Sequence, residues 1–310
     1  MLKAAKMIDI INSDFFEHIK TIETNSIDMV LTDPPYGLDA LDENWSIDTL
    51  TKRKSDGVIK SLPKGMKFDR SQSYKFEEFY SKVSKEIFRV LKPGGLFLSF
   101  SSQRLYHRMC VSVEDNGFEI RDMMAWVYTQ SQAKAFAFNH FIEKDKKLSE
   151  LEKKDIIFRL NGWKSMQLKP AIEPICFANK PVEGTFVNNF LKYNVGLLNS
   201  NNSTGTDKFP TNVVTTNEIN DFIDNVFLIN KPTKTEKGVF NSHPSVKPVQ
   251  LMEHFINLFT MEGATILDPF AGSGTTLVAC QNTNRNGIGI EISQEYCEMI
   301  KKRLEFQSLF

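Results

Sequence analysis

The chain is 310 residues long and 41% hydrophobic, enough to bury one large core or two modest ones, and its 38 lysines and arginines balance 38 aspartates and glutamates. This balance argues against a protein that coats nucleic acid through a global basic field, but it allows an enzyme with a local basic groove. The four cysteines are scattered and lack metal-ligand spacing, which predicts free thiols and no metal site. The sequence has no apolar run long enough for a bilayer and no signal-peptide core. We therefore expect a cytoplasmic protein without a membrane partner.

The first half of the chain alternates short apolar strands with amphipathic helices. Strands are predicted over residues 7–11, 27–32, 96–100, 118–128 and 171–178, and helices over 15–21, 76–91 and about 101–115. Pro93-Gly94-Gly95 is expected to end the second helix before the next strand begins. Pro174 indicates an edge or a bend in the fifth strand. Alternating strands and helices indicate a parallel sheet with helices on its faces.

Three segments break this rhythm. Residues 38–75 lose their periodicity and are positively charged, which suggests either a loop that contacts phosphate or a solvated charge run near the active site. Residues 143–155 balance five lysines against five acids, a pattern typical of a solvated helix. Residues 179–242 are rich in asparagine, threonine, glycine and proline, and we predict an insert with its own function there.

Asp33-Pro34-Pro35-Tyr36 follows directly on the strand at 27–32. Two prolines fix φ and remove two backbone donors, so the strand must end at Asp33. Its side chain is then presented at the carboxyl edge of the sheet, where open α/β folds bind ligands. An acceptor, a rigid turn and an aromatic face suit a flat ring that bears an amine, although an ordinary strand-ending turn would have the same sequence.

The last third contains a nucleotide-binding β-α-β pattern. Helices are predicted over 248–259, 275–281 and 294–306, and strands over 264–267 and 286–290. Gly272 and Gly274 allow a ligand to approach the backbone closely at the start of a helix, and Glu291 ends the next strand, where an acid can accept hydrogen bonds from ribose hydroxyls. The dinucleotide fingerprint would need a third glycine near Leu277, and Asp268 would repel a pyrophosphate. A cationic adenosine ligand fits better, which points to S-adenosylmethionine rather than NAD.

Three motifs in this order resemble the β class of S-adenosylmethionine-dependent DNA amino-methyltransferases, of the N6-adenine type. They are Asp33-Pro34-Pro35-Tyr36, then His-Pro-Ser-Val-Lys-Pro at 243–248, and then Asp-Pro-Phe-Ala-Gly-Ser-Gly-Thr-Thr at 268–276. In that family the target-base motif comes first and the cofactor motif last, whereas related protein-glutamine and ribosomal-RNA enzymes place the cofactor motif first. Leu-Lys-Pro-Gly-Gly at 91–95 and Lys-Pro-Ala-Ile-Glu-Pro-Ile at 169–175 are similar to methyltransferases of phages and prophages.

The resemblance implies a single catalytic domain over residues 1–310. Its fold would be a doubly wound, mostly parallel, Rossmann-like α/β sheet that is circularly permuted, with a target-recognition insert at 179–242 and the basic loop 38–75 beside the site. It also implies double-stranded DNA as partner, in a bacterial or phage-infected cell, and S-adenosylmethionine as cofactor without a metal. It leaves open whether a cognate restriction endonuclease accompanies the chain and whether the chain forms a homodimer.

The resemblance also implies which residues hold the cofactor. The methionine part would be cradled by Asp268, Phe270, Gly272 and Gly274. Glu291 would bind the ribose, and Asp14 with Phe15 would lie by the adenine ring. Lys247 would face the methionine carboxylate, although a surface lysine beside a helix start explains it equally well.

Catalysis is assigned to the first motif. The Asp33 carboxylate and the Pro34 carbonyl would accept hydrogen bonds from the target amine, within the turn that Pro35 makes rigid. Tyr36 would stack on the base, and Phe100 is a weaker aromatic candidate that core packing also explains. The base must leave the duplex to reach them, and transfer needs no covalent enzyme intermediate.

Three alternatives remain. N4-cytosine methylation is the nearest, because the family uses Ser-Pro-Pro-Tyr for cytosine and Asp-Pro-Pro-Tyr for adenine as a tendency rather than a rule. A nucleotide-dependent oxidoreductase would use the same β-α-β unit but would leave the first motif unexplained. An inactive DNA-binding descendant of the enzyme is the third alternative.

Overall fold

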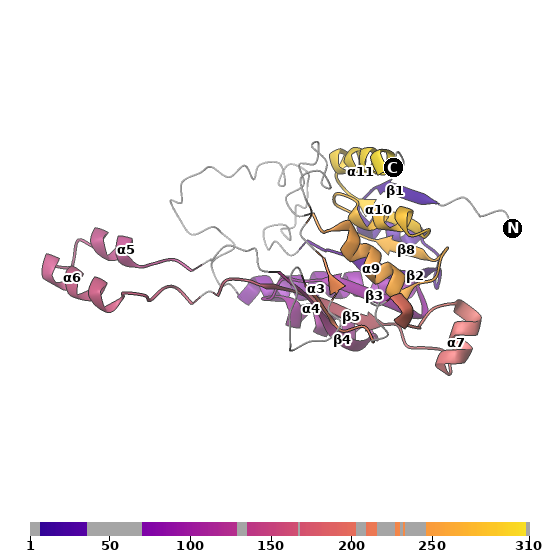
Figure 1. The fold of residues 1–310 in the computed structure, drawn as a ribbon, viewed down its shortest axis with the longest axis horizontal. Coiled ribbons are helices and arrows are strands. Elements are labelled where there is room, and N and C mark those ends of the chain that lie inside the picture. Colours follow the sequence, from indigo (N-terminus) through magenta and orange to yellow (C-terminus); the bar gives the residue numbers. More distant parts are fainter. Residues whose placement is uncertain are drawn as a thin grey trace.

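The computed structural model describes residues 7–35, 70–128, 135–166, 168–202, 209–215, 227–229, 232 and 246–307. Within these ranges nine strands form one sheet in the order β1-β9-β8-β2-β3-β5-β4-β6-β7 (Figure 1). The strands are β1 (Ile8–Asn12), β2 (Ile27–Thr32), β3 (Leu91–Phe100), β4 (Glu119–Val127), β5 (Ile172–Asn179), β6 (Val213–Thr215), β7 (Phe227–Leu228), β8 (Thr265–Asp268) and β9 (Asn286–Glu291). Only β5 runs antiparallel to its neighbours, which confirms the mostly parallel α/β sheet.

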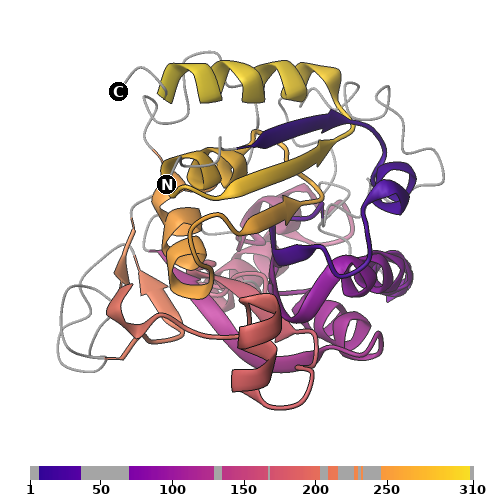
Figure 2. The same ribbon diagram turned by 90° about the vertical axis from the view of Figure 1, so that its right-hand side faces the viewer.

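Helices cover both faces of the sheet. One face carries α1 (Phe15–His18), its 3-10 extension η1 (Ile19–Thr21), α3 (Arg70–Val90) and α4 (Tyr106–Glu114), and the other carries α9 (Val249–Phe259), α10 (Thr275–Asn282) and α11 (Gln294–Gln307). Figure 2 shows α3 and α4 in purple on the opposite side of the sheet from α9 in orange. Neighbouring residues of β2 alternate accordingly: Val30 packs with the α3 side, and Leu31 packs with the α9 side. The fold is therefore doubly wound, as predicted.

The sheet order does not follow the chain order. The C-terminal strands β8 and β9 lie between β1 and β2, which come from the first 32 residues. This arrangement places the glycine turn after β8 beside the strand that ends at Asp33, and it agrees with the predicted circular permutation.

Two predicted boundaries were wrong. α3 begins at Arg70, inside the segment predicted as the basic loop 38–75, whose residues 38–69 lie outside the described residues. β3 begins at Leu91 and contains Pro93-Gly94-Gly95, which was expected to separate the helix from the strand. Leu91 pairs with Ile27 and the ladder resumes where Leu96 pairs with Met29, so the residues between them form a bulge with Gly94 at φ +77°.

β5 lies inside the sheet, between β3 and β4. Pro174 pairs with Ala125 of β4, while the last residue of β3, Phe100, pairs with Ile175. The proline therefore stands just beyond the end of β3, where its missing N–H breaks no ladder bond on that side. Its carbonyl accepts a hydrogen bond from the Ser101 backbone N–H at 2.9 Å. Pro174 thus lies in a central strand, but at a residue that has a strand partner on one side only.

The segment 179–242 is partly built into the sheet. Its described residues include α7 (Phe186–Tyr193), the 3-10 turn η4 (Ser200–Asn202), β6 and β7. β6 pairs in parallel with β4, and β7 pairs with β6. The expectation that this segment lacks α/β structure was wrong at these two strands, because three-residue and two-residue strands leave no clear periodicity in a sequence. Its role as the recognition insert stays a prediction.

A helical hairpin projects from the body between β4 and β5 (Figure 1). This arm, residues 135–166, contains α5 (Asn139–Lys144) and α6 (Glu150–Arg159), and neither helix has a buried residue. α6 starts with a capping box, in which Ser149 and Glu152 exchange hydrogen bonds. The charge run 143–155 has no buried residue in its helices, as predicted, but it spans the end of α5, a turn and the start of α6 rather than one helix.

The four cysteines are free thiols, and all but the half-buried Cys110 are buried, as predicted. Among the described helices, none combines the length and apolarity that crossing a bilayer would require. Across the same residues, no three side chains of the metal-binding types lie close enough together to hold an ion.

Candidate functional site

Five neighbouring parallel strands end at one edge of the sheet. In spatial order these are β1, β9, β8, β2 and β3, and all of them point the same way. Carboxylates lie at or just past four of these ends: Asp14, Glu291, Asp268 and Asp33. The sheet therefore brings together acids from both ends of the chain at the edge where open α/β folds bind ligands.

The turn after β8 is built from residues that permit an unusual backbone. Gly272 and Gly274 have φ of +52° and +76°, in the region that favours glycine. A Cβ atom at Gly274 would also lie 2.7 Å from the Ile300 side chain of α11. The buried Arg303, one turn further along α11, donates a hydrogen bond to the Ser273 carbonyl at 2.6 Å and so fixes the back of the turn.

The absent third glycine has a structural explanation. At that position Leu277 is fully buried and packs against β9, where the facing residues are glycines. A Cβ at Gly289 would lie 2.6 Å from Leu277 Cδ1, and one at Gly287 would lie 2.9 Å from Leu277 Cδ2. The close helix–strand packing that a third glycine would allow is achieved here by glycines in the strand instead of the helix.

Asp268 is buried at the end of β8. Its Oδ1 accepts hydrogen bonds from the Thr32 hydroxyl at 2.7 Å and from the Phe270 backbone N–H at 3.2 Å. Burial raises the pKa of the Asp268 carboxyl to about 6, although the hydrogen bonds from Thr32, Thr276 and Phe270 oppose the shift. Because Thr32 immediately precedes Asp33, this bond joins the two motifs directly.

Glu291 ends β9 and folds over the glycine turn. Its two carboxylate oxygens each accept a backbone N–H, from Gly272 at 2.8 Å and from Ser293 at 2.8 Å. Burial raises the pKa of the Glu291 carboxyl to about 6, and these hydrogen bonds oppose the shift. A carboxylate oxygen can accept more than one hydrogen bond, so the group can still bind a ribose.

Asp14 and Phe15 lie beside the same turn. Asp14 is the N-cap of α1, where its Oδ1 accepts the Phe16 N–H at 2.7 Å. The ring of Phe15 is buried, and its centroid lies 5.4 Å from that of Phe270. Capping explains Asp14 structurally, and the Phe15–Phe270 contact brings together two aromatic residues that were predicted to lie by the adenine and methionine parts of the cofactor.

The base-binding side is centred on Asp33. Pro34 is buried and Pro35 is half-buried, while Tyr36 lies outside the described residues, so its stacking role stays a prediction. Phe100 is fully buried and its ring centroid lies 6.4 Å from that of Phe255, which supports core packing over base stacking.

Lys247 lies on this side too, because its ammonium forms an ion pair with Asp33. The alternative of a surface lysine was wrong, since Lys247 is only 5% exposed. Its predicted partner, the methionine carboxylate, would have to share the ammonium with Asp33.

Three further residues of the site escaped the sequence analysis. Thr32 had a signal, since it is a polar residue at the end of an apolar strand and adjoins Asp33. Glu173 forms an ion pair with Lys247, but only the antiparallel placement of β5 brings the two together. Arg303 belongs to a helix of mixed composition, and its contact with the glycine turn depends on how α11 packs.

The donor set fits S-adenosylmethionine. The described turn from Asp268 to Thr276 contains no lysine or arginine that would hold a phosphate. It offers instead a buried carboxylate that suits a cation, and Glu291 offers a carboxylate for hydroxyl groups. When bound, S-adenosylmethionine supplies an electrophilic methyl group on a sulfonium.

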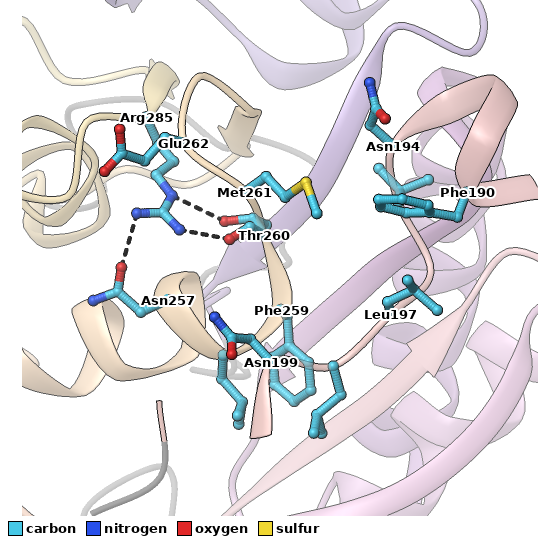
Figure 3. Close-up of a pocket in the computed structure, with 13 residues that line it drawn as sticks. Phe190, Asn194, Leu197, Asn199, Asn257, Phe259, Thr260, Met261, Glu262 and Arg285 are labelled. Carbon is cyan, nitrogen blue, oxygen red and sulfur yellow. Dashed lines mark hydrogen bonds between the residues drawn. The ribbon is translucent and has the colours of Figure 1, made fainter. Parts of the chain in front are cut away.

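A separate cavity of about 640 Å³ lies at the opposite edge of the sheet (Figure 3). It is lined by α7 and the segment after it and by the end of α9 and the residues that follow, including Phe190, Leu197, Phe259 and Met261. Its one arginine, Arg285, donates hydrogen bonds to the Thr260 carbonyl and to the Asn257 side chain. The guanidinium therefore stabilises the wall of the cavity. The cavity contains none of the residues that the motifs brought together at the carboxyl edge.

Comparison with known proteins gives concordant matches. The family model described as DNA methylase, for N6 and N4 methyltransferases, matches residues 27–302. The Type II methyltransferase M.HindIII of Haemophilus influenzae is 31% identical and aligns over 92% of this chain and 91% of its own length. The DNA adenine methyltransferase YhdJ of Escherichia coli is 24% identical over 96% of this chain and 83% of its own. The crystal structure of the M1.HpyAVI–SAM complex shares the fold, with a TM-score of 0.55, 23% identity and coverage of 96% and 99%.

Proposed function

The chain belongs to the N6/N4 DNA methylase family, and on that premise we propose that it transfers a methyl group from S-adenosylmethionine to the N6 amine of an adenine in double-stranded DNA. One observation carries the proposal: the hydrogen bond of Thr32 to Asp268 holds the base-binding motif and the glycine turn side by side. We expect a protein with this activity to act in the cytoplasm of a bacterial or phage-infected cell.

The chemistry asks little of the protein beyond positioning. The exocyclic amine of adenine is a weak nucleophile, because its lone pair is delocalised into the ring. Asp33 and the Pro34 carbonyl, as hydrogen-bond acceptors, would hold the two amine hydrogens so that the lone pair points at the methyl group. The N–CH₃ bond forms as the S–CH₃ bond breaks, the bonding electrons stay on sulfur, and the nitrogen then releases a proton to water.

A duplex base cannot reach Asp33, so the target must rotate out of the stack, as other base-modifying enzymes require. Tyr36 would then stack on the ring. Asp268, Glu291, Phe15 and Phe270 would hold the cofactor on the other side of Asp33. The negative charge at the strand ends favours both the cationic donor and the positive charge that the amine acquires during transfer.

Adenine is the proposed base because position 33 is an aspartate and because the relative YhdJ is named a DNA adenine methyltransferase. The family itself includes enzymes for N4 amines, so cytosine is the second candidate. DNA from cells that express the protein should contain N6-methyladenine when its nucleosides are analysed by mass spectrometry. N4-methylcytosine in its place would refute the adenine assignment, and the absence of both would refute methyl transfer and favour an inactive DNA-binding descendant.

Asp33→Ala tests the site itself. We expect this variant to bind S-adenosylmethionine with wild-type affinity in calorimetry and to lose methyl transfer by at least about a thousandfold, because the amine loses its charged acceptor. Asp9→Ala is the matched control, since Asp9 is a half-buried aspartate of β1 with no assigned role. Transfer at the wild-type rate by Asp33→Ala would remove Asp33 from the mechanism.

A further inference from the structure

A buried lysine connects the proposed catalytic aspartate to a second carboxylate. The Lys247 ammonium forms an ion pair with Asp33 Oδ2 and another with Glu173 Oε2 at 3.2 Å. The lysine side chain is 5% exposed, whereas the side chains of Asp33 and Glu173 are 20% and 26% exposed. The cation therefore lies beneath two carboxylates that both reach the surface of the site.

Three distant segments build this cluster. Asp33 follows β2, Glu173 lies near the start of β5, and Lys247 immediately precedes Pro248, the N-cap of α9. Phe100 at the end of β3 pairs with Ile175, so the antiparallel β5 carries Glu173 to the same edge as Asp33. The Lys247 nitrogen also lies 4.9 Å from the centre of the Phe100 ring, which gives the ammonium a fixed aromatic floor.

The carboxylates outweigh the cost of burying the cation. Burial disfavours the charged form of Lys247, but the attraction of the Asp33 and Glu173 carboxylates and the hydrogen bond that the ammonium donates to Asp33 more than compensate, so the pKa of the ammonium lies above its usual value. Lys247 is thus a permanent positive charge at the pH of the cell. Two carboxylates and one ammonium leave the cluster with a net charge of −1.

We propose that Lys247 and Glu173 are positioning residues for Asp33: Lys247 holds the carboxylate in place beneath the target base, and Glu173 holds Lys247 and restores the negative charge that Lys247 cancels. This inference rests on the proposed function and adds two residues to it. Methyl transfer moves a positive charge from sulfur to the amine, and a neutral Asp33–Lys247 pair alone would stabilise that charge poorly. With Glu173 present, Lys247 holds Asp33 in place and the cluster still carries the negative charge that stabilises the positive amine.

The proposal predicts that each single substitution lowers kcat and that the double substitution recovers part of the loss caused by Lys247→Met. Glu173→Gln leaves a neutral Asp33–Lys247 pair, so kcat should fall about tenfold. Lys247→Met leaves two adjacent carboxylates without a cation, and their mutual repulsion misplaces Asp33, so kcat should fall about a hundredfold. The double variant returns the cluster to −1, and its kcat should exceed that of Lys247→Met by about tenfold.

The assay measures tritiated methyl transfer from S-adenosylmethionine to long unmethylated DNA, which contains short target sites of any sequence. kcat and the KM for the cofactor are determined separately, and thermal melting shows that each variant is folded. The KM for the cofactor should stay within about threefold of wild type in all three variants. A KM that rises tenfold or more in Lys247→Met, with kcat unchanged, would assign the lysine to the methionine carboxylate and overturn the proposal.

The exposed ion pair between Glu78 and Lys82 supplies matched controls. Its atoms lie 2.9 Å apart on side chains of α3 that are more than half exposed, outside the segments given a role in binding. Glu78→Gln, Lys82→Met and their combination should all transfer at the wild-type rate.

Two further results would overturn the inference alone: wild-type kcat in Glu173→Gln, or a double variant no faster than Lys247→Met. An inactive wild-type protein would instead refute the proposed function, so the two failures are distinguishable. If Lys247→Met does not fold, Glu173→Gln still decides, because a lower kcat at an unchanged melting temperature separates the charge effect from a loss of folding.

Discussion

Asp268 and Glu291 end adjacent strands, and burial raises the pKa of each carboxyl to about 6. Both groups are ionised at pH 7.5 and largely protonated at pH 5. A cationic ligand favours their ionised forms, so its binding and their deprotonation are coupled.

We therefore expect the affinity for S-adenosylmethionine to fall as the pH drops through 6. Calorimetry between pH 5 and 8 would measure this, and near pH 6 binding should release protons into the buffer. Asp268→Asn should bind more weakly at pH 7.5 and show a shallower pH dependence. An affinity that is constant from pH 5 to 8 would contradict the assigned roles of these acids.

The stability of the ligand-free chain should have the opposite pH dependence to ligand affinity. Each acid has a higher pKa in the folded chain than its ordinary value of 3.8 or 4.5, so the folded state binds more protons between those values and about 6. The contribution of these two groups to the free energy of unfolding should fall as the pH rises through this range.

Sequence reasoning located the acids better than their partners. Asp33, Asp268 and Glu291 were found because each ends an apolar strand, and strand ends of a parallel sheet meet at one edge. Glu173 and the true surroundings of Lys247 were missed, because they depend on an antiparallel strand whose direction its sequence does not encode. The buried ammonium was also unpredictable from composition, since lysine is usually exposed.

At the scale of elements, the geometry of the glycine turn before α10 predicts how much stability Gly274→Ala should lose. Gly274→Ala must adopt a positive φ and also place its Cβ 2.7 Å from Ile300. Gly263→Ala is a matched control, because Gly263 has φ +81° but no atom within 4 Å of such a Cβ.

The control should lose about 1 kcal/mol of unfolding free energy through backbone strain alone. Gly274→Ala should lose about 2–4 kcal/mol, because overpacking adds to the strain. Chemical denaturation measures both. Equal losses in the two variants would show that the contact with Ile300 does not constrain the turn.

The arm gives a second prediction at this scale. Its helices have no buried residue, and the Tyr128 N–H donates to the Ala171 carbonyl at 2.8 Å at its base. Replacing residues 129–170 with an Asn-Gly turn should therefore close β4 and β5 as a hairpin. The shortened protein should melt no lower than wild type and bind S-adenosylmethionine equally well. Loss of cooperative melting would show that the arm supports the core.

Elements with clear periodicity were predicted well, and the errors fall where periodicity is absent. Most strands and helices of the two sequence flanks agree with the structure to within a few residues. Pro93-Gly94-Gly95 was misassigned because such residues normally separate elements, whereas here a bulge keeps them in β3. β6 and β7 were missed because they owe their form to the sheet edge they extend, a tertiary effect.

At the scale of the whole molecule, the cofactor would join the two ends of the chain. Its proposed contacts come from the loop after β1, from the turn after β8 and from the end of β9, and these lie side by side in the sheet. Ligand that binds only the folded chain should raise its stability by about 2.7 kcal/mol at 100 times the Kd.

S-adenosylmethionine should thus raise the melting temperature of wild type and of Asp33→Ala by the same amount. Asp268→Ala, which lacks the buried acid, should show a smaller shift at the same ligand concentration. A differential scanning fluorimeter measures all three. A reduced shift in Asp33→Ala would show that the two halves of the site are not independent.

The direct pairing of β2 with β8 has a consequence for how such a protein can diversify. Neighbouring strands lie about 4.8 Å apart whatever their side chains, and here the acceptor for the target base and the cradle for the methyl donor follow two neighbouring strands. The distance between the methyl donor and the target amine is then set by the spacing of the two strands. The arm, whose helices have no buried residue, can be exchanged, lengthened or lost without changing this spacing. We expect new target sites to arise in such outlying parts while the chemistry stays fixed.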